Sequence, residues 1–315
     1  MAALLLVSVF LGRYPAPYAM SPARLLEDEM ARRLVLGVRL PRLLVAALLG
    51  MTMGGAGTVL QMLFANPLVE PGFLGVSQGA AFGAALAIVA LGNVGWRVQL
   101  LAVIFAFLGL ALSYWLARRL RYGGWVLRLV LAGISVSALF SAGLGLLKYW
   151  ADPIRELPEI TFWLLGGLWG VSWVSLHTIL PVVAAGLLVL WCMRWRLNLL
   201  CLQDTTAFSL GVSPGRERAL LLVAAVTPTA AVVAIAGMVG WIGLIVPHLA
   251  RRLLGADARY SLPGSMLLGG LFAVACDDLA RVPFPGEVPL GILTSLLGAV
   301  CFLALMLTRP PEARR

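Results

Sequence analysis

Long apolar runs recur along the whole chain, and most are close to the length that one membrane-crossing helix requires. A helix needs about 20 mainly apolar residues to cross the hydrocarbon core of a bilayer. Of the 315 residues, 61% are hydrophobic and only 12% are charged, whereas a soluble domain has about 25% charged residues. The sequence therefore predicts an all-α, polytopic membrane protein.

The runs predict about ten transmembrane helices in a single domain that covers residues 1–315. We place them at 1–16, 40–63, 73–92, 98–118, 126–149, 173–193, 219–237, 241–253, 263–281 and 288–308. The eighth is too short to span and is expected to be a half-helix beside irregular backbone. The first is short as well, so it either continues toward Tyr18 or lacks upstream residues.

The distribution of charge indicates how the chain is oriented. With both termini in the cytoplasm, more than half of the 24 basic residues and a minority of the 14 acidic residues fall inside. This is the direction of the positive-inside rule. The first outside segment, SPARLLEDEMARRLVLGVRL, mixes apolar and charged residues and is expected to lie as an amphipathic helix on the outer interface.

The longest polar interruption, residues 194–219, lies on the cytoplasmic side in this topology. Helical spacing up to Gly211, followed by the turn Ser213-Pro214-Gly215, predicts two short helices outside the membrane at about 199–217. An ordinary loop is the alternative. A compact helix pair is what a soluble partner could bind.

The stretch QMLFANPLVEPGFLGVSQGA, residues 61–80, is rich in glycine and proline and contains no basic residue. Without a basic residue a phosphate-binding loop is disfavoured. Pro67 and Pro71 are expected to end the preceding helix. Irregular backbone at membrane depth is tolerated only where protein buries it or a water-filled cavity adjoins it, so this stretch is expected to fold inward toward a pathway.

Catalytic motifs are missing from the sequence. It contains no Walker A, GxSxG or HExxH pattern, and its two histidines and four cysteines are not spaced as metal ligands. No charged residue stands deep in a predicted helix, which disfavours coupling to an ion gradient. We therefore expect no enzyme activity, no cofactor, no metal and no nucleic-acid partner, but a transport protein in membrane lipid that a separate motor drives. A stand-alone, ion-coupled secondary transporter is the alternative.

Seven motifs follow one another in an order that is characteristic of one family. They are VRLPRLLVAALLG, QMLFANPLVEPGFLGVSQGA, ITFWLLGG, FSLGV, AGMVGWIGLIVPHLARRLLG, LPGSMLLGG and EVPLGILTSLLGAVCF. From Arg39 to Leu307 the chain resembles the FecCD family, the permease subunits of bacterial type II ABC importers.

The resemblance implies ten helices per subunit and a homodimer with a central translocation pathway in the bacterial inner membrane. Two ATPase subunits, which bind ATP and magnesium, would dock inside, and a periplasmic binding protein would deliver the substrate outside. The substrate would be an iron-siderophore, then haem, then cobalamin, with an oxyanion such as molybdate still open. A heterodimer with a paralogue also stays open.

Three arginines match family positions that meet acidic residues of the binding protein. These are Arg39, Arg42 and Arg281, and the predicted topology places all three at the outer surface, where exposed charges could steer docking. The alternative is that they snorkel to lipid headgroups.

Four residues match the cytoplasmic gate of the family. Asn66 and Leu68 correspond to positions that narrow the inner end of the pathway, and Val126 and Leu127 to their neighbours. The latter two are apolar here, where the cobalamin permease has small hydroxyl residues, so the gate could close by dewetting.

The segment from Asp204 to Gly211 matches the coupling helix that sits in a cleft of the ATPase. Within it, Asp204, Phe208, Leu210 and Gly211 are the predicted coupling residues, with Phe208 as the apolar anchor. Two departures from the family pattern could alter the mouth of the pathway, in a direction that stays open. They are Val300 in place of proline, which could reduce a kink in the tenth helix, and the additional acid Asp278.

Overall fold

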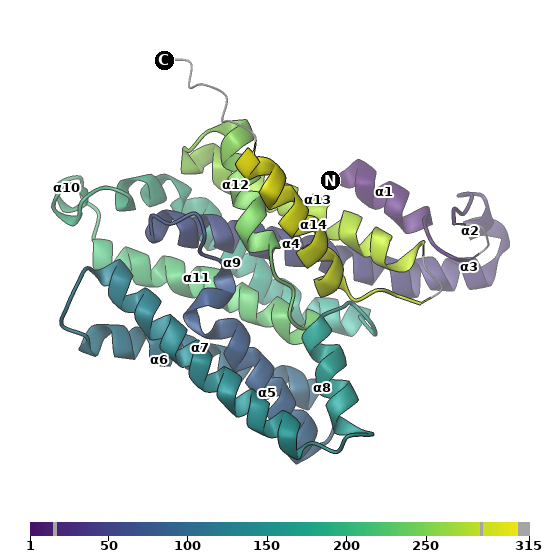
Figure 1. The fold of residues 1–315 in the computed structure, drawn as a ribbon. Helices are drawn as coiled ribbons and strands as arrows, with labels where there is room; N and C mark the ends of the chain where they lie inside the picture. The colour runs from purple at the N-terminus through teal and green to yellow at the C-terminus, as the bar shows by residue number, and fades with distance from the viewer. Residues whose placement is uncertain (15–17, 284–285, 308–315) are drawn as a thin grey trace.

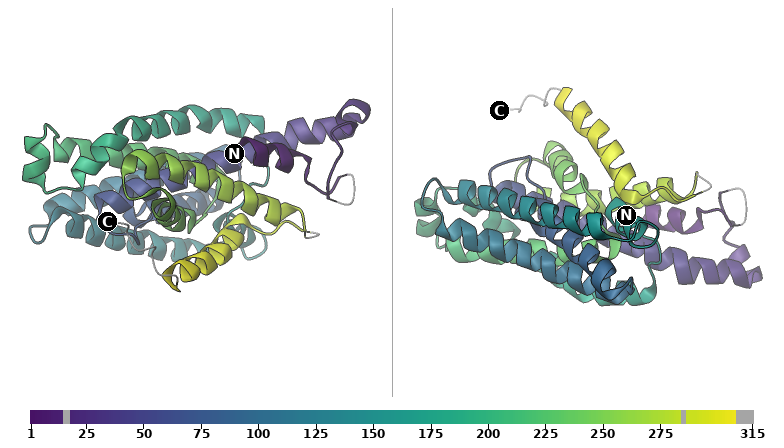
Figure 2. Two further views of the ribbon diagram at one scale, coloured as in Figure 1. Left: turned by 90° about the horizontal axis from the view of Figure 1, so that it is seen from above. Right: turned by 60° about the horizontal axis from the view of Figure 1, so that its bottom comes forward.

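The computed structural model describes residues 1–14, 18–283 and 286–307. Within these ranges every regular element is a helix, and the long helices run side by side (Figures 1 and 2). The C-terminal residues that were predicted to be cytoplasmic lie outside the described part. The elements are α1 (Ala2–Phe10), α2 (Arg24–Glu27), α3 (Glu29–Leu34), η1 (Val35–Arg39), α4 (Leu40–Leu63), η2 (Pro71–Leu74), α5 (Val76–Leu91), α6 (Gly95–Arg119), α7 (Trp125–Trp150), α8 (Glu156–Leu165), α9 (Trp173–Leu200), α10 (Asp204–Ser209), α11 (Pro214–Ala236), α12 (Ile242–Leu254), α13 (Ala258–Arg281) and α14 (Leu290–Leu307).

The prediction of an all-helical, multi-pass membrane protein is confirmed. Seven helices of the described chain are long and apolar enough to cross a membrane, and α5 is a shorter apolar helix. The count of ten spans stays a prediction.

The first long span is a continuous helix from Glu29 to Leu63, formed by α3, η1 and α4. Its 35 residues extend for about 52 Å at 1.5 Å per residue. The expected separate amphipathic helix on the outer interface was therefore wrong: α3 continues α4 in line, and the end at α2 and α3 projects beyond the other helices (Figure 2). Its π turn, η1, ends just before Pro41, which has no N–H for a regular helical bond.

The α4 helix occupies the centre of the molecule because glycines let other helices approach it closely. It packs along α13, α11, α12 and α9 (Figure 1). A Cβ placed on Gly50 would lie 2.0 Å from the carbonyl oxygen of Gly269, and one on Gly57 would lie 2.0 Å from that of Gly243. Small residues in membrane helices permit this backbone contact.

Two helical spans are interrupted, and the interruptions lie next to each other. The first is the segment from Phe64 to Gly75, which contains η2, and the second is the segment from Gly237 to Trp241 between α11 and α12. The half-helix expected at 241–253 is α12, with 13 residues. A Cβ on Gly243, at the start of α12, would lie 2.5 Å from Pro71, and the backbone N–H of Trp241 contacts Glu70, so the two interruptions lie against each other.

The polar region between α9 and α11 differs from the expectation of two short helices. The α9 helix continues to Leu200, and α10 is one short helix of six residues. The predicted second short helix was wrong, since Pro214 is the first residue of the long α11.

Candidate functional site

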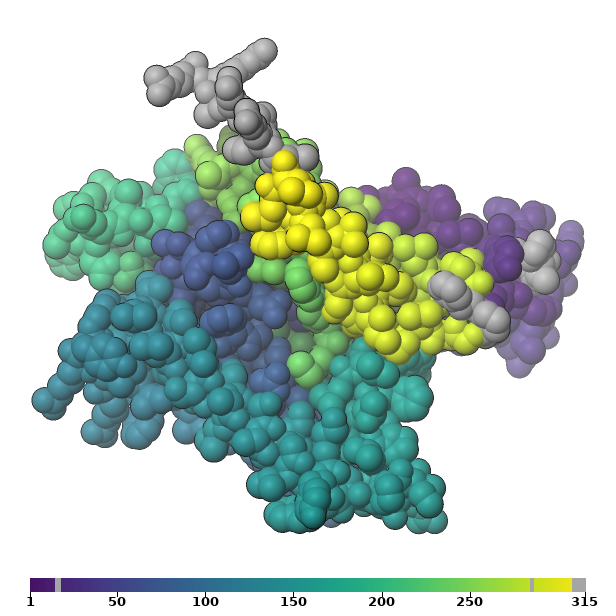
Figure 3. Space-filling model, in the orientation of Figure 1, coloured from purple at the N-terminus to yellow at the C-terminus, as the bar shows by residue number. Residues whose placement is uncertain are grey.

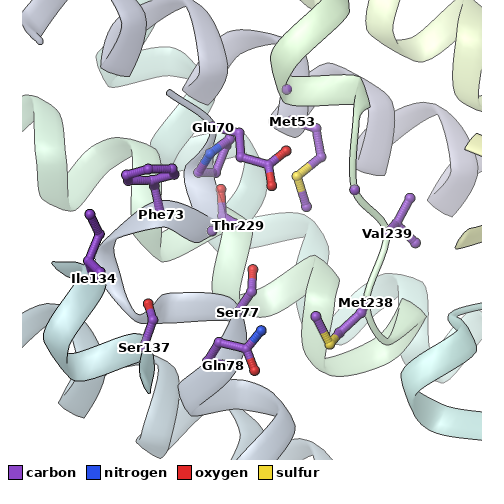
Figure 4. A pocket seen from close by; sticks show the side chains of 14 residues that line it. Met53, Glu70, Phe73, Ser77, Gln78, Ile134, Ser137, Thr229, Met238 and Val239 are labelled. Atoms are coloured by element: carbon purple, nitrogen blue, oxygen red, sulfur yellow. The ribbon is translucent and has the colours of Figure 1, made fainter. Parts of the chain in front are cut away.

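A hollow of about 300 Å³ lies where the two interrupted spans meet. It opens on the face of the molecule between α7 and α14, which is visibly hollowed in Figure 3. Its lining comes from α4, the η2 segment, α5, α7, α11 and the connection to α12 (Figure 4). The hollow thus depends on the breaks in the helices, because unbroken helices would fill this space with side chains.

Polar side chains gather around this hollow in an otherwise apolar protein. They are Glu70, Ser77, Gln78, Ser137 and Thr229, and they come from four different segments of the chain (Figure 4). The backbone N–H of Trp241 donates to Oε2 of Glu70 at 3.4 Å. Trp241 itself has a φ of +70°, a conformation that side-chain-bearing residues adopt rarely. The carboxylate of Glu70 thus connects the η2 segment to the interruption before α12.

The helices on either side of the hollow have exposed apolar faces. Ile134 lines the hollow from α7 and is 49% exposed, and Leu139 of the same helix is 65% exposed. On α14, Leu296 and Leu303 are 60% and 61% exposed. These two faces lack partners within the described chain.

The predicted gate residues lie at one end of the molecule, on two segments that contact each other. The rings of Phe64 and Trp125 are 5.7 Å apart and join the connection after α4 to the start of α7. Leu68 and Leu127 are exposed there, while Val126 is half-buried. The side-chain oxygen of Asn66 accepts the backbone N–H of Leu68 at 2.9 Å, so it stabilises its own turn.

At the same end, α10 projects farthest from the helix bundle (Figure 1). Phe208 is 72% exposed and Leu210 55% exposed, whereas Ala207 is buried between them and the bundle. Asp204 forms an ion pair with Arg218 of α11 at 2.7 Å. Gly211 ends the helix with a φ of +78°, which favours glycine. The four predicted coupling residues therefore lie on a small projection with an apolar tip.

At the same end, hydrogen bonds join α9 to the start of α13. The amide of Asn198 donates to Asp257 at 2.8 Å and accepts the backbone N–H of Ala258 at 2.9 Å. Hydrogen bonds from Arg259 and Asn198 hold the pKa of Asp257 well below its usual range. This carboxylate is therefore ionised where it caps α13.

The three predicted docking arginines lie together at the opposite end, as expected, but they are not exposed. Arg42 contacts Asp277 and Glu287, and Arg281 contacts Asp277 and Asp278. Arg39 donates to the carbonyl oxygens of Val9 and Tyr14. The expectation of exposed charges was wrong, because carboxylates and carbonyl groups, most of them distant in sequence, enclose the guanidinium groups.

Two buried polar residues that join helices were not among the predicted site residues. Asp277, near the end of α13, is fully buried, and its spacing of four from Arg281 was the only local signal. Gln61 is also buried: it donates to the carbonyl oxygens of Gly243 and Leu244 and accepts from Arg251 at 2.6 Å. It thus joins α4 to both ends of α12.

A sequence model of the FecCD transport family matches residues 1–308. The chain belongs to this family. A probable iron chelatin transport system permease protein of Helicobacter pylori is 39% identical over 275 residues, which are 87% of this chain and 82% of that protein. The hemin transport system permease protein HmuU of Yersinia pestis is 41% identical over 280 residues, covering 86% and 82%.

Among solved structures, the FecCD chain is similar to an inward-facing metal-chelate type ABC transporter. The TM-score is 0.90 at 36% identity, and the match covers 97% of this chain and 95% of the other. The interrupted spans, the projecting α10 and the buried arginines therefore belong to a FecCD permease fold, in a multi-pass membrane protein.

Proposed function

We propose that this chain is the membrane-spanning permease subunit of an ATP-driven importer for iron chelates. The observation that carries the proposal is the polar hollow on the face between α7 and α14, which adjoins two interrupted spans. Polar groups and irregular backbone at this depth require a water-filled cavity or a protein cover. A pathway for a polar solute satisfies this requirement.

A second copy of the chain would complete the pathway. The exposed apolar faces of α7 and α14 flank the hollow, and a two-fold axis between two copies would bring both hollows onto one central channel. Oligomers of this kind use the same surface on both subunits, which fits faces that have no partner within the described chain.

Separate ATPase subunits would supply the energy. The tip formed by Phe208 and Leu210 has the chemistry of an anchor, with apolar side chains on a rigid base. Phe208 would enter a cleft of the ATPase, and the ion pair between Asp204 and Arg218 would transmit its movement to α11.

A periplasmic binding protein would dock at the arginine end. Arg42 and Arg281 are buried and carboxylates already balance their charges, so they would not attract the binding protein as exposed charges. A hollow of about 170 Å³ remains there, lined by Arg39, Arg42, Arg281 and Glu287 among others. An acidic side chain of the binding protein would contact the arginines within this hollow.

For the substrate we propose an iron-siderophore first, haem second and cobalamin third. The relatives named above carry iron chelates and hemin, and a wide pathway between two copies suits large chelates. Import would run from the periplasm to the cytoplasm across the inner membrane.

The test is transport in proteoliposomes that contain the permease together with a partner ATPase and a partner binding protein. We expect uptake of a ⁵⁵Fe-loaded siderophore only with internal ATP and the binding protein present. Vesicles with the permease alone, given a proton or sodium gradient, are the control. Gradient-driven uptake without the ATPase would overturn the proposal in favour of a secondary transporter.

A further inference from the structure

Two adjoining hollows form a groove along the side of the bundle, between α6 and α11. One, of about 290 Å³, is lined by Tyr114, Ala117, Arg118, Trp125, Arg128, Gly215 and Ala219. The other, of about 320 Å³, is lined by Phe107, Leu110, Ala111, Tyr114, Ala219, Leu222 and Val223. Tyr114 and Ala219 belong to both linings, so the hollows are two parts of one groove, separate from the hollow between α7 and α14.

The two parts have opposite chemistry. The first contains two arginines and, among its described lining residues, no acidic side chain. The second is lined by apolar side chains and the ring of Tyr114. The starts of α7 and α11 also border the basic part, through Trp125 and Gly215. Helix N-termini carry partial positive charge, so helix ends and arginines together favour an anion.

The arginines have donor capacity left for such an anion. Arg128 donates from Nη1 to the carbonyl oxygen of Leu120 at 3.0 Å, which uses one of the five N–H groups of its guanidinium. Arg118 is exposed and lies over the ring of Tyr114, 5.6 Å from its centroid. Neither forms an ion pair with a described carboxylate at 4 Å or less.

The length of the groove matches one leaflet of a bilayer. Arg118 and Phe107 are eleven residues apart on α6, which is about 16 Å at 1.5 Å per residue. Half of a hydrocarbon core of roughly 30 Å has about this depth. The basic part lies at the end of α6 and the apolar part nearer its middle, which is the order of a headgroup and an acyl chain.

We propose that this groove binds an anionic phospholipid of the leaflet on the α10 side. The phosphate lies between Arg118 and Arg128, and an acyl chain follows Tyr114 toward Phe107. Basic pockets between membrane helices are known to suit acidic headgroups. The bound lipid joins α6, α7 and α11 next to Arg218, whose guanidinium lies 5.4 Å from the ring centroid of Trp125 and holds α10 through Asp204.

The test is native mass spectrometry of the full-length permease in detergent with added phosphatidylglycerol or phosphatidylcholine of the same acyl chains. We expect tighter binding of phosphatidylglycerol. Each arginine near an anionic headgroup contributes about fivefold in affinity, so Arg118→Gln with Arg128→Gln should weaken phosphatidylglycerol binding by roughly thirtyfold. Ala111→Trp, which fills the apolar part and leaves both charges, should weaken the binding of that lipid too.

The matched control is Arg97→Gln at the opposite end of α6. Arg97 also lies over an aromatic ring and also donates to a backbone carbonyl, but it lies outside the groove. Its substitution should leave lipid binding unchanged. Equal binding of the two lipids by the parent protein, or unchanged binding in the double variant, would overturn the proposal. If Arg128→Gln prevents folding, the exposed positions Arg118→Gln and Ala111→Trp decide the question by the same criterion.

Discussion

Nη2 of Arg42 lies 2.9 Å from Oδ1 of Asp277, although the two residues are 235 positions apart in the chain. Both side chains are buried, and the pair joins α4 to α13 at the arginine end. A buried charge that loses its partner is costly, commonly by about 3–5 kcal/mol.

We therefore expect Asp277→Ala to lower the free energy of unfolding by about 3–5 kcal/mol, because Arg42 and Arg281 lose a shared carboxylate. Unfolding of the purified protein in mixed detergent micelles measures the change. The control is Glu29→Ala, since Glu29 and Arg33 form an exposed pair with side-chain exposures of 75% and 76%, and such pairs contribute under about 1 kcal/mol. Equal losses in both variants would show that Asp277 is not a structural partner.

The close crossing of α4 and α13 gives a second prediction. Gly50→Ala should destabilise the protein by more than about 2 kcal/mol, because its Cβ would collide with the backbone of Gly269 rather than with a flexible side chain. Gly145→Ala on α7 is the control, since no atom lies within 4 Å of its added Cβ. The yield of folded protein and its unfolding midpoint are the measurements. Equal stability of the two variants would contradict the crossing.

The projection at α10 leads to a prediction about coupling. Phe208→Ala should uncouple ATP hydrolysis from transport and reduce uptake at least about tenfold, while the protein stays inserted, because truncating a central aromatic anchor removes about 2 kcal/mol or more of binding. Gly211→Pro should act similarly, since proline cannot adopt a positive φ. Phe162→Ala, which is also exposed but lies on α8, is the control. Normal uptake in the Phe208 variant would count against the coupling role.

Polar substitutions of two apolar residues test the proposed gate. Val126→Ser and Leu127→Ser should increase passive leak of substrate through proteoliposomes without ATP, because a hydroxyl favours wetting of a narrow apolar constriction. The matched control is Leu146→Ser, because Leu146 lies toward the other end of α7 and its exposed fraction is close to that of Leu127. Leak rates equal to those of the parent protein would exclude a dewetting gate at these two positions.

Much of the fold was predictable because a helix that crosses a lipid bilayer must be long and apolar. Apolar runs located the long helices, and Pro67, Pro71 and the short run after Gly240 indicated both interruptions. Gly211 correctly predicted the end of α10. These are local signals, in which the residues that decide the structure stand close together in the chain.

The errors concern interactions over long sequence distances. Arg42 was predicted to be exposed because the predicted topology places it at the outer surface, whereas Glu287 and Asp277 reach it from 245 and 235 positions away. The helix from Glu29 to Leu63 was divided at its polar part, because the sequence does not show that this end projects past the bundle. The polar hollow and the α6–α11 groove exist only through packing.

The uninterrupted course of that helix has a mechanical consequence. A helix bends little compared with a loop, so its two ends move largely as one rod. Arg39 and Arg42 lie in its first half, and its last residue leads directly into the turn of Asn66 and, through Phe64, to the start of α7. A displacement imposed at Arg42 is therefore delivered to the turn of Asn66 within a single helix, α4.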